Sequence, residues 1–96
     1  MKAIVTVLGK DKKGIIAKVS TALYELETNI EDISQTILQD YFTMIMAVQI
    51  DNKTLSFAQI VEKLHQLGNE LDVQINIQSQ SIFDSMHTIS TNTNKI

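Results

Sequence analysis

The residues best suited to bind a small ligand lie in a glycine-containing segment near the start of the chain. It reads Gly9-Lys10-Asp11-Lys12-Lys13-Gly14-Ile15 and holds two of the three glycines of the sequence. A β-rich run precedes the segment and a helical pattern follows it, which predicts a strand, a turn and a helix N-terminus. The first N–H groups of a helix have no partner inside it and carry the positive end of its dipole. Such a loop can bind a carboxylate, and its lysines add a positive field.

A second polar position is Asn29, which precedes Ile30 at the far end of the predicted helix. We expect the chain to bring Asn29 back beside the loop. Its side-chain amide could there both donate and accept a hydrogen bond. The two positions together predict a small-ligand site without catalytic machinery.

Each of these residues also has an explanation that requires no ligand. Gly14 could serve a tight turn, and Asp11 could cap the first helix. Asn29 could end the same helix in a left-handed conformation, and the loop lysines could simply be solvated. The sequence leaves these alternatives open.

Composition excludes several classes of function. A chain of 96 residues with 44% hydrophobic residues fits one globular domain, and no apolar run approaches the roughly 20 residues that cross a bilayer. We therefore expect a cytoplasmic protein without membrane contact. There is no cysteine for a disulfide or a thiolate site, and the net charge is −3 without any arginine. Nucleic-acid binding is therefore disfavoured.

The sequence also lacks a set of residues that would suggest catalysis. We find no Ser/His/Asp or paired-carboxylate arrangement, and His65 and His87 do not have the spacing of metal ligands. Met44 and Met46 lie at strand period and are interpreted as core residues. We predict no enzyme activity, no metal and no cofactor.

Hydrophobic periodicity predicts six elements in the order β-α-β-β-α-β. The strands are expected at residues 2–8, 30–38, 42–50 and 73–78. The first helix begins at Gly14, with Ile16, Val19, Leu23 and Leu26 on its core face. The second begins with a Ser56/Gln59 capping box and stops at Gly68-Asn69.

This order predicts an α+β fold of ferredoxin-like type. Right-handed crossovers give a four-stranded antiparallel sheet of order 4-1-3-2 with both helices on one face. The other face combines polar and apolar residues, which motivates a homodimer hypothesis. The polar members are Thr43, Gln49, Gln74 and Gln78, and the apolar members are Val5, Val7, Ile45 and Ala47.

The last part of the chain predicts a short extension and a tail. Ile82, Met86 and Ile89 could form one face of a helix that begins at about residue 80. Residues 90–96 are rich in Thr and Asn and are expected to be disordered. The predicted domain therefore spans residues 1–89.

The chain resembles an ACT domain, and in particular the small stand-alone ACT proteins of bacteria. The resemblance covers about residues 1–89. It is carried by the segment 9–15 with Asn29-Ile30, and is helped by Asp32-Ile33-Ser34-Gln35 and Tyr41-Phe42-Thr43-Met44. It departs from the family at Lys13, where effector-binding members often have proline.

The resemblance implies a non-enzymatic regulatory module that binds an amino acid and acts on a separate partner protein. It implies a pocket lined by the residue at Asp11 and by Asn29, and the acidic Asp11 suits a zwitterion better than a phosphate. The expected ligand-binding residues are Gly9, Asp11, Lys13, Gly14, Ile15, Asn29 and Ile30. The alternative is a structural protein–protein interaction domain that binds no ligand.

Overall fold

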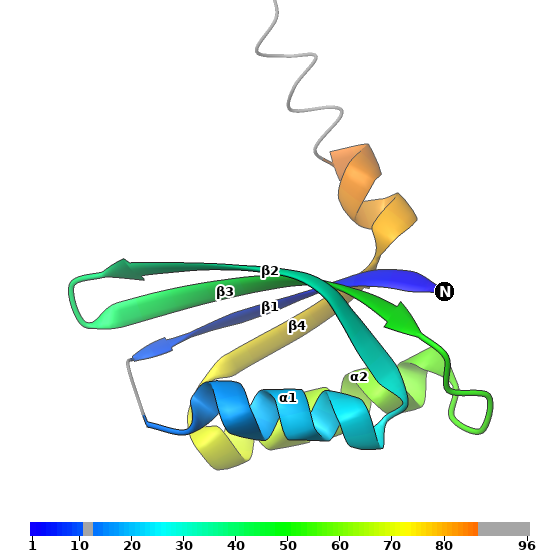
Figure 1. Ribbon diagram of the computed structural model, residues 1–96, viewed down its shortest axis with the longest axis horizontal. Helices are drawn as coiled ribbons and strands as arrows, with labels where there is room; N and C mark the ends of the chain where they lie inside the picture. Colours follow the sequence, from blue (N-terminus) through cyan, green and yellow to red (C-terminus); the bar gives the residue numbers. More distant parts are fainter. Residues whose placement is uncertain (11–12, 87–96) are drawn as a thin grey trace, which may run out of the picture.

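The computed structural model describes residues 1–10 and 13–86, and within them the six main elements follow the order β-α-β-β-α-β (Figure 1). They are β1 (Lys2–Lys10), α1 (Ile15–Glu25), β2 (Thr28–Leu38), β3 (Tyr41–Ile50), α2 (Phe57–Leu71) and β4 (Gln74–Ser79). All strand pairs are antiparallel, and the sheet order is β2-β3-β1-β4. The predicted ferredoxin-like fold is confirmed, with α1 and α2 on one face. A further short helix, residues 80–86, lies on the other side of the sheet.

The hydrophobic core lies between the sheet and the two helices. Val5 and Val7 of β1 are fully buried there, because they pair with the buried Met46 and Met44 and share their face. The expectation that Val5 and Val7 lie on the outer face is therefore wrong. Both alternating sets of β1 are apolar, so only the packing of the helices decides which set is covered.

Helix α1 places a different isoleucine in the core from the one expected. Ile15 is buried together with Val19 and Leu23, whereas Ile16 is 44% exposed. The helix ends before Asn29, because Glu27 takes the left-handed conformation with φ 53°. Asn29 belongs to β2 and does not end the helix.

Helix α2 begins as predicted and ends later than predicted. The backbone N–H of Gln59 donates to Ser56 Oγ at 3.2 Å, and Ser56 N–H donates to Gln59 Oε1 at 2.8 Å, which completes the capping box. The helix continues through Gly68 to Leu71. A Cβ at Gly68 would lie 2.8 Å from the carbonyl oxygen of Val73, so this glycine permits close helix–strand packing. The expected stop at Gly68-Asn69 is wrong.

Strand β2 contains an irregularity that explains its apolar spacing. The register with β3 shifts between Ile30 and Asp32, which is a β-bulge. The extra residue allows Ile30, Ile33 and Ile37 all to face the helix side of the sheet. Ile33 and Ile37 are nevertheless 42% and 64% exposed, because neither helix covers that half of the strand.

Among the residues that the structure describes, no helix has the length and apolar character needed to span a membrane.

Candidate functional site

The connection between β1 and α1 is shorter than the sequence predicts. Gly9 and Lys10 belong to β1 and pair with Phe42 and Tyr41. The connection that remains leads directly into Gly14, which occupies the N-cap position of α1. Asp11 lies outside the described residues, so its predicted contact with a ligand remains a prediction.

The backbone at position 14 has a left-handed conformation that favours glycine. Its φ is +83°, a left-handed value that side chains with a Cβ rarely adopt, although a Cβ there would meet nothing within 4 Å. The N–H of Lys18 donates to the Gly14 carbonyl at 2.9 Å and closes the first turn of α1. The N–H groups of Ile15, Ile16 and Ala17 precede this bond and have no acceptor inside the helix. They form a donor-rich end that is exposed at Gly14 and Lys13.

Ile15 can contribute to such a site only through its backbone. Its side chain is 3% exposed and belongs to the core cluster. Lys10 and Lys13, in contrast, have exposed side chains near the same end of α1. This end of the molecule therefore combines helix N–H donors with two positive charges.

Gly9 has a packing role that the sequence did not reveal. A Cβ at Gly9 would lie 2.5 Å from Val73 Cγ1 and 3.1 Å from Val73 Cβ. Real Cβ atoms do not approach other atoms this closely, so glycine is needed where β1 passes Val73. The presence of Gly9 is explained without a ligand.

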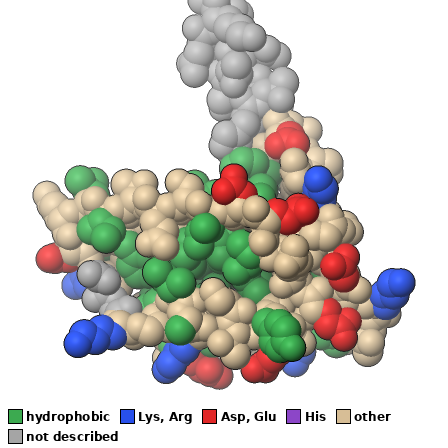
Figure 2. Space-filling view, viewed as in Figure 1, with side chains coloured by type: hydrophobic (Ala, Val, Ile, Leu, Met, Phe, Trp, Pro, Cys, Tyr) green, Lys and Arg blue, Asp and Glu red, His purple; other side chains and the backbone are tan. Residues whose placement is uncertain are grey.

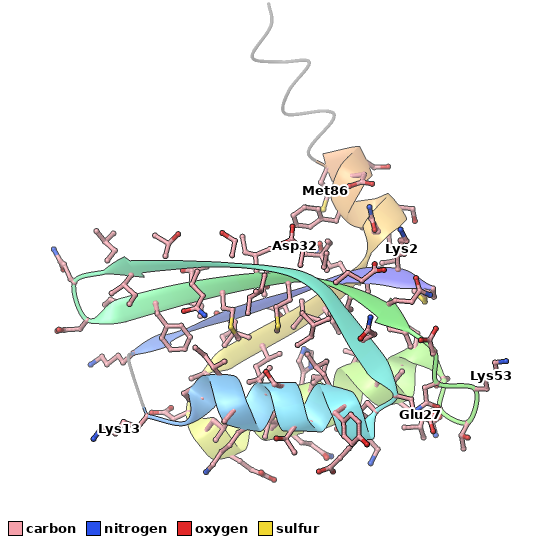
Figure 3. The ribbon with its side chains drawn as sticks, in the orientation of Figure 1. Lys2, Lys13, Glu27, Asp32, Lys53 and Met86 are labelled. Atoms are coloured by element: carbon pink, nitrogen blue, oxygen red, sulfur yellow. The ribbon has the colours of Figure 1, made fainter. Side chains whose placement is uncertain are left out.

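Asn29 does not lie beside the loop of its own chain. It pairs with Gln49 of β3, whereas Gly9 pairs with Phe42. Seven residues along a strand correspond to about 23 Å. Figure 3 shows Lys13 and Glu27 at opposite ends of α1. The expected return of Asn29 to the loop is therefore wrong within one chain.

Asn29 lines a shallow hollow of about 610 Å³ at the C-terminal end of α1. Its side chain is exposed, while the neighbouring Ile30 is half-buried against the core. The hollow is also lined by Tyr24, Glu25, Glu27, Thr28 and Asp51. Three carboxylates make this end of α1 acidic, in contrast to the lysines at the other end.

Asn52 supports this acidic end, a role that was not predicted from the sequence. Its Nδ2 donates to the carbonyl of Leu26 at 3.0 Å, and its Oδ1 accepts from the N–H groups of Thr54 and Leu55, both at 2.8 Å. The side chain thus joins the end of α1 to the connection between β3 and α2. The available signal was an asparagine two residues after the end of β3, because asparagine often bonds to nearby backbone in turns.

An apolar hollow opens between β2 and α1. Figure 2 shows hydrophobic side chains gathered there on the surface of the molecule. The exposed apolar residues of these two elements include Ile16, Ile33 and Ile37. Contiguous exposed apolar surface of this kind typically marks an interaction site.

The other residues considered from the sequence are the two histidines and the pair Met44 and Met46. His65 is exposed on α2, as expected, and His87 lies outside the described residues. Met44 and Met46 are fully buried, which confirms their assignment to the core. In the described part of the chain, no group of three or more His, Cys, Asp or Glu residues could hold a metal.

Comparison with known proteins assigns the family. The sequence profile described as the ACT domain matches residues 2–78. The chain belongs to the ACT domain family. ACT domains are regulatory ligand-binding modules that commonly bind amino acid effectors and dimerise. The helix at residues 80–86 lies outside the matched range of this ACT domain.

Two relatives match this ACT domain over most of its length. A UPF0237 protein of Streptococcus mutans is 53% identical over 89 residues, which are 93% of this chain and 100% of the relative. The solved structure of an ACT domain protein from Streptococcus pneumoniae has a TM-score of 0.77 and 52% identity, and the match covers 86% of this chain and 93% of the other.

A more distant structure is also similar to this ACT domain. It is the regulatory subunit of aspartate kinase from Thermus flavus, with a TM-score of 0.60 and 26% identity. The match covers 81% of this chain and 51% of that subunit.

Proposed function

We propose that this ACT domain is a regulatory module that binds an amino acid, or a similar small zwitterion, between two copies of the chain. The observation that carries the proposal is the separation of the predicted site residues. The loop end with Lys13 and Gly14 and the acidic end with Asn29 lie at opposite ends of α1. An antiparallel arrangement of two copies would place the loop end of each beside the Asn29 end of the other.

Strand β2 is the element that could make this arrangement. It is an edge strand of 11 residues, and its outer edge pairs with no other strand among the described residues. Such an edge can pair with another strand. Pairing about a two-fold axis at Gln35 would set Ile33 of one copy opposite Ile37 of the other, on the same face. The apolar hollow between β2 and α1 would then be covered from both sides.

Charge complementarity supports the same arrangement. Each loop end, with Lys10 and Lys13, would approach an end that carries Glu27 and Asp51. The helix N–H groups and lysines suit a carboxylate, and the acidic hollow with Asn29 suits an ammonium group. The mixed charge favours a free amino acid over a phosphate.

The proposal includes a mode of action. The module acts by binding, and occupancy of the interface is conveyed to a separate protein in the cytoplasm. Ligand binding between two copies would stabilise one relative orientation, which a partner can recognise. The regulated protein would be one that binds the liganded dimer more tightly than the dimer without ligand.

Calorimetric titration of the twenty amino acids tests the ligand. We expect at least one to bind, and Asn29→Ala to abolish its binding with little effect on the unfolding temperature. Ala58→Lys, on the exposed side of α2, is the matched control and should bind normally. The absence of binding by all twenty would refute the ligand and support the alternative of an interaction domain without ligand.

A mixing experiment tests whether the site is shared between two chains. Asn29→Ala and Lys13→Glu should each abolish binding when present alone. A mixed dimer of the two variants contains one site with an intact Asn29 and an intact Lys13, and one site that carries both substitutions. We therefore expect unfolding and refolding of the mixture to restore one site per mixed dimer, which is half of the two sites of the wild-type dimer. No restoration, with both variants folded, would show that the site is not shared.

A further inference from the structure

We propose that the sheet face opposite α1 and α2, together with the helix at residues 80–86, forms a second interface between copies of this chain. This interface is separate from the β2 edge used in the proposed function. An assembly that uses both would contain four chains. The proposal stands on the composition of the face, on the position of the short helix and on the area that each supplies.

The centre of this face is apolar. Ile4 pairs with Ala47, and Leu8 and Ile45 lie on the same face; we call these four residues the outer patch. Leu8 is 45% exposed and Ile45 is 41% exposed. The patch is thus accessible in the single chain, although it lies in the middle of a sheet.

Few charged residues surround the outer patch, although Asp32 pairs with its member Ala47. Within the described strands, the outward positions that pair in register are charged only at Lys2, Lys10 and Asp32. Lys2 and Lys10 stand at the two ends of β1, and Asp32 stands on the edge strand. Threonine, asparagine and glutamine occupy most positions between them. A centre without charges and a polar rim are the signature of a protein–protein interface.

The helix at residues 80–86 adds a second apolar surface on the same side. It follows β4 directly and stands off the sheet (Figure 1). Ile82 and Met86 lie four residues apart on one side of it and are 56% and 53% exposed. Figure 3 places Met86 on this projecting helix, on the side of the sheet to which Asp32 and Lys2 point. So short a helix requires packing of its apolar side to be stable.

A second copy of the chain can cover both the outer patch and the apolar side of the helix at residues 80–86. Each copy offers a patch on its sheet and an apolar helix that projects from the same side. In a two-fold arrangement the helix of each copy packs on the outer patch of the other, and the contact closes. An unrelated partner would have to supply both complements by itself.

The area that a stable interface buries is larger than the sheet face alone and requires the helix as well. Four strands about 4.8 Å apart and about seven residues long present a face of roughly 440 Å². A stable interface buries about 800 Å² on each partner. The sheet face alone falls short of that area, and an exchanged helix supplies additional contact on both sides.

Mass measurement by light scattering, over a range of concentrations, tests this interface. The chain has a mass of 10.8 kDa, and the two interfaces together predict a tetramer of about four times that mass. Ile45→Lys and the double variant Ile82→Ser/Met86→Ser should each reduce it to a dimer. Ala58→Lys should leave it unchanged, and amino acid binding should survive in both interface variants.

The outcomes separate the parts of the proposal. If both variants have the same mass as the wild type, the proposed interface is wrong, and the outer patch binds a partner other than a second copy of the chain. A loss of mass with Ile45→Lys alone overturns the role of the helix. Because Ile82 and Met86 are exposed and lie outside the sheet, the double variant keeps the test valid if Ile45→Lys fails to fold.

A direct contact measurement completes the test. The chain has no cysteine, so Met86→Cys can carry a single nitroxide label. We expect this label to broaden the amide signals of Leu8 and Ile45 in isotope-labelled wild-type chains mixed with it. Absence of broadening in a mixture that has exchanged subunits overturns the exchanged helix.

Discussion

Gly14 shows how one residue can look functional for a reason of backbone conformation. Its φ of +83° costs little for glycine but about 1–2 kcal/mol for most other residues. A Cβ would meet nothing there, so the cost of substitution is conformational only. Occupancy by glycine therefore does not by itself indicate a ligand.

A pair of substitutions at Gly14 tests this interpretation. Gly14→Ala should lower the free energy of unfolding by about 1–2 kcal/mol. Gly14→Asn should lower it less, because asparagine tolerates the left-handed region. Urea unfolding measures both values. Equal losses for the two variants would contradict the conformational explanation.

Gly9 presents the opposite case, in which a neighbouring side chain excludes a Cβ. Gly9→Ala should destabilise the fold by about 1–3 kcal/mol, because the new methyl group would meet Val73 Cγ1. Val73→Ala removes that atom and should reduce the cost of Gly9→Ala. A double-mutant cycle by urea unfolding measures this coupling. Additive losses would show that the two residues do not compete for space.

Asn52 joins two parts of the chain, the end of α1 and the β3–α2 connection. Asn52→Ala removes one hydrogen bond to the end of α1 and two within the β3–α2 connection. We expect a loss of about 1–3 kcal/mol in the free energy of unfolding. Asn52→Asp keeps the acceptor oxygen but sets a carboxylate oxygen against the Leu26 carbonyl at an acidic end of α1, so it should also be destabilising. No loss of stability in either variant would contradict this assignment.

At the scale of elements, β2 is the strand on which the proposed assembly depends. Its second half extends beyond the cover of α1, and Ile37 is 64% exposed there. Ile37→Lys should weaken the contact between two copies, because it places a charge against the Ile33 of the other copy. Sedimentation measures the mass, and Ala58→Lys is again the control. An unchanged mass would exclude the β2 edge as an interface.

At the scale of the whole molecule, stability should depend on concentration. A dimer that covers the apolar hollow unfolds with dissociation, so its unfolding temperature should rise with protein concentration. The bound amino acid should add about 2.7 kcal/mol at one hundred times its dissociation constant. Ile37→Lys should weaken the concentration dependence and leave only the part that the outer-patch interface contributes. An unfolding temperature independent of concentration in the wild type would contradict the dimer.

Much of the architecture could be predicted from the sequence because the relevant forces are local. Alternating apolar residues in β3 and the capping box at Ser56 each act within a few residues, and both are confirmed. The order of elements then restricts the sheet to few topologies, and the predicted order is observed. The resemblance to the ACT family rests on the segment 9–15 with Asn29-Ile30, and the match of the ACT domain profile to residues 2–78 confirms the family.

The predicted site depended on contacts that the sequence does not encode locally. Gly9 is constrained by Val73, a residue 64 positions away, and Asn29 is held by its pairing with Gln49 at the far end of α1. The β-bulge after Ile30 determines which isoleucines of β2 face the helices. Each of these features arises from the pairing of distant segments.

The sequence by itself determined the elements and their order, because periodicity and capping are properties of neighbouring residues, and its segment 9–15 with Asn29-Ile30 carried the resemblance to the ACT family. Only the tertiary structure decided which face of β1 is buried and where the two parts of the predicted pocket lie. The physical reason is that both sets of β1 side chains are apolar, so burial depends on where the helices pack. The same packing separates the lysine end of α1 from the Asn29 end, which makes a second chain necessary for the proposed site.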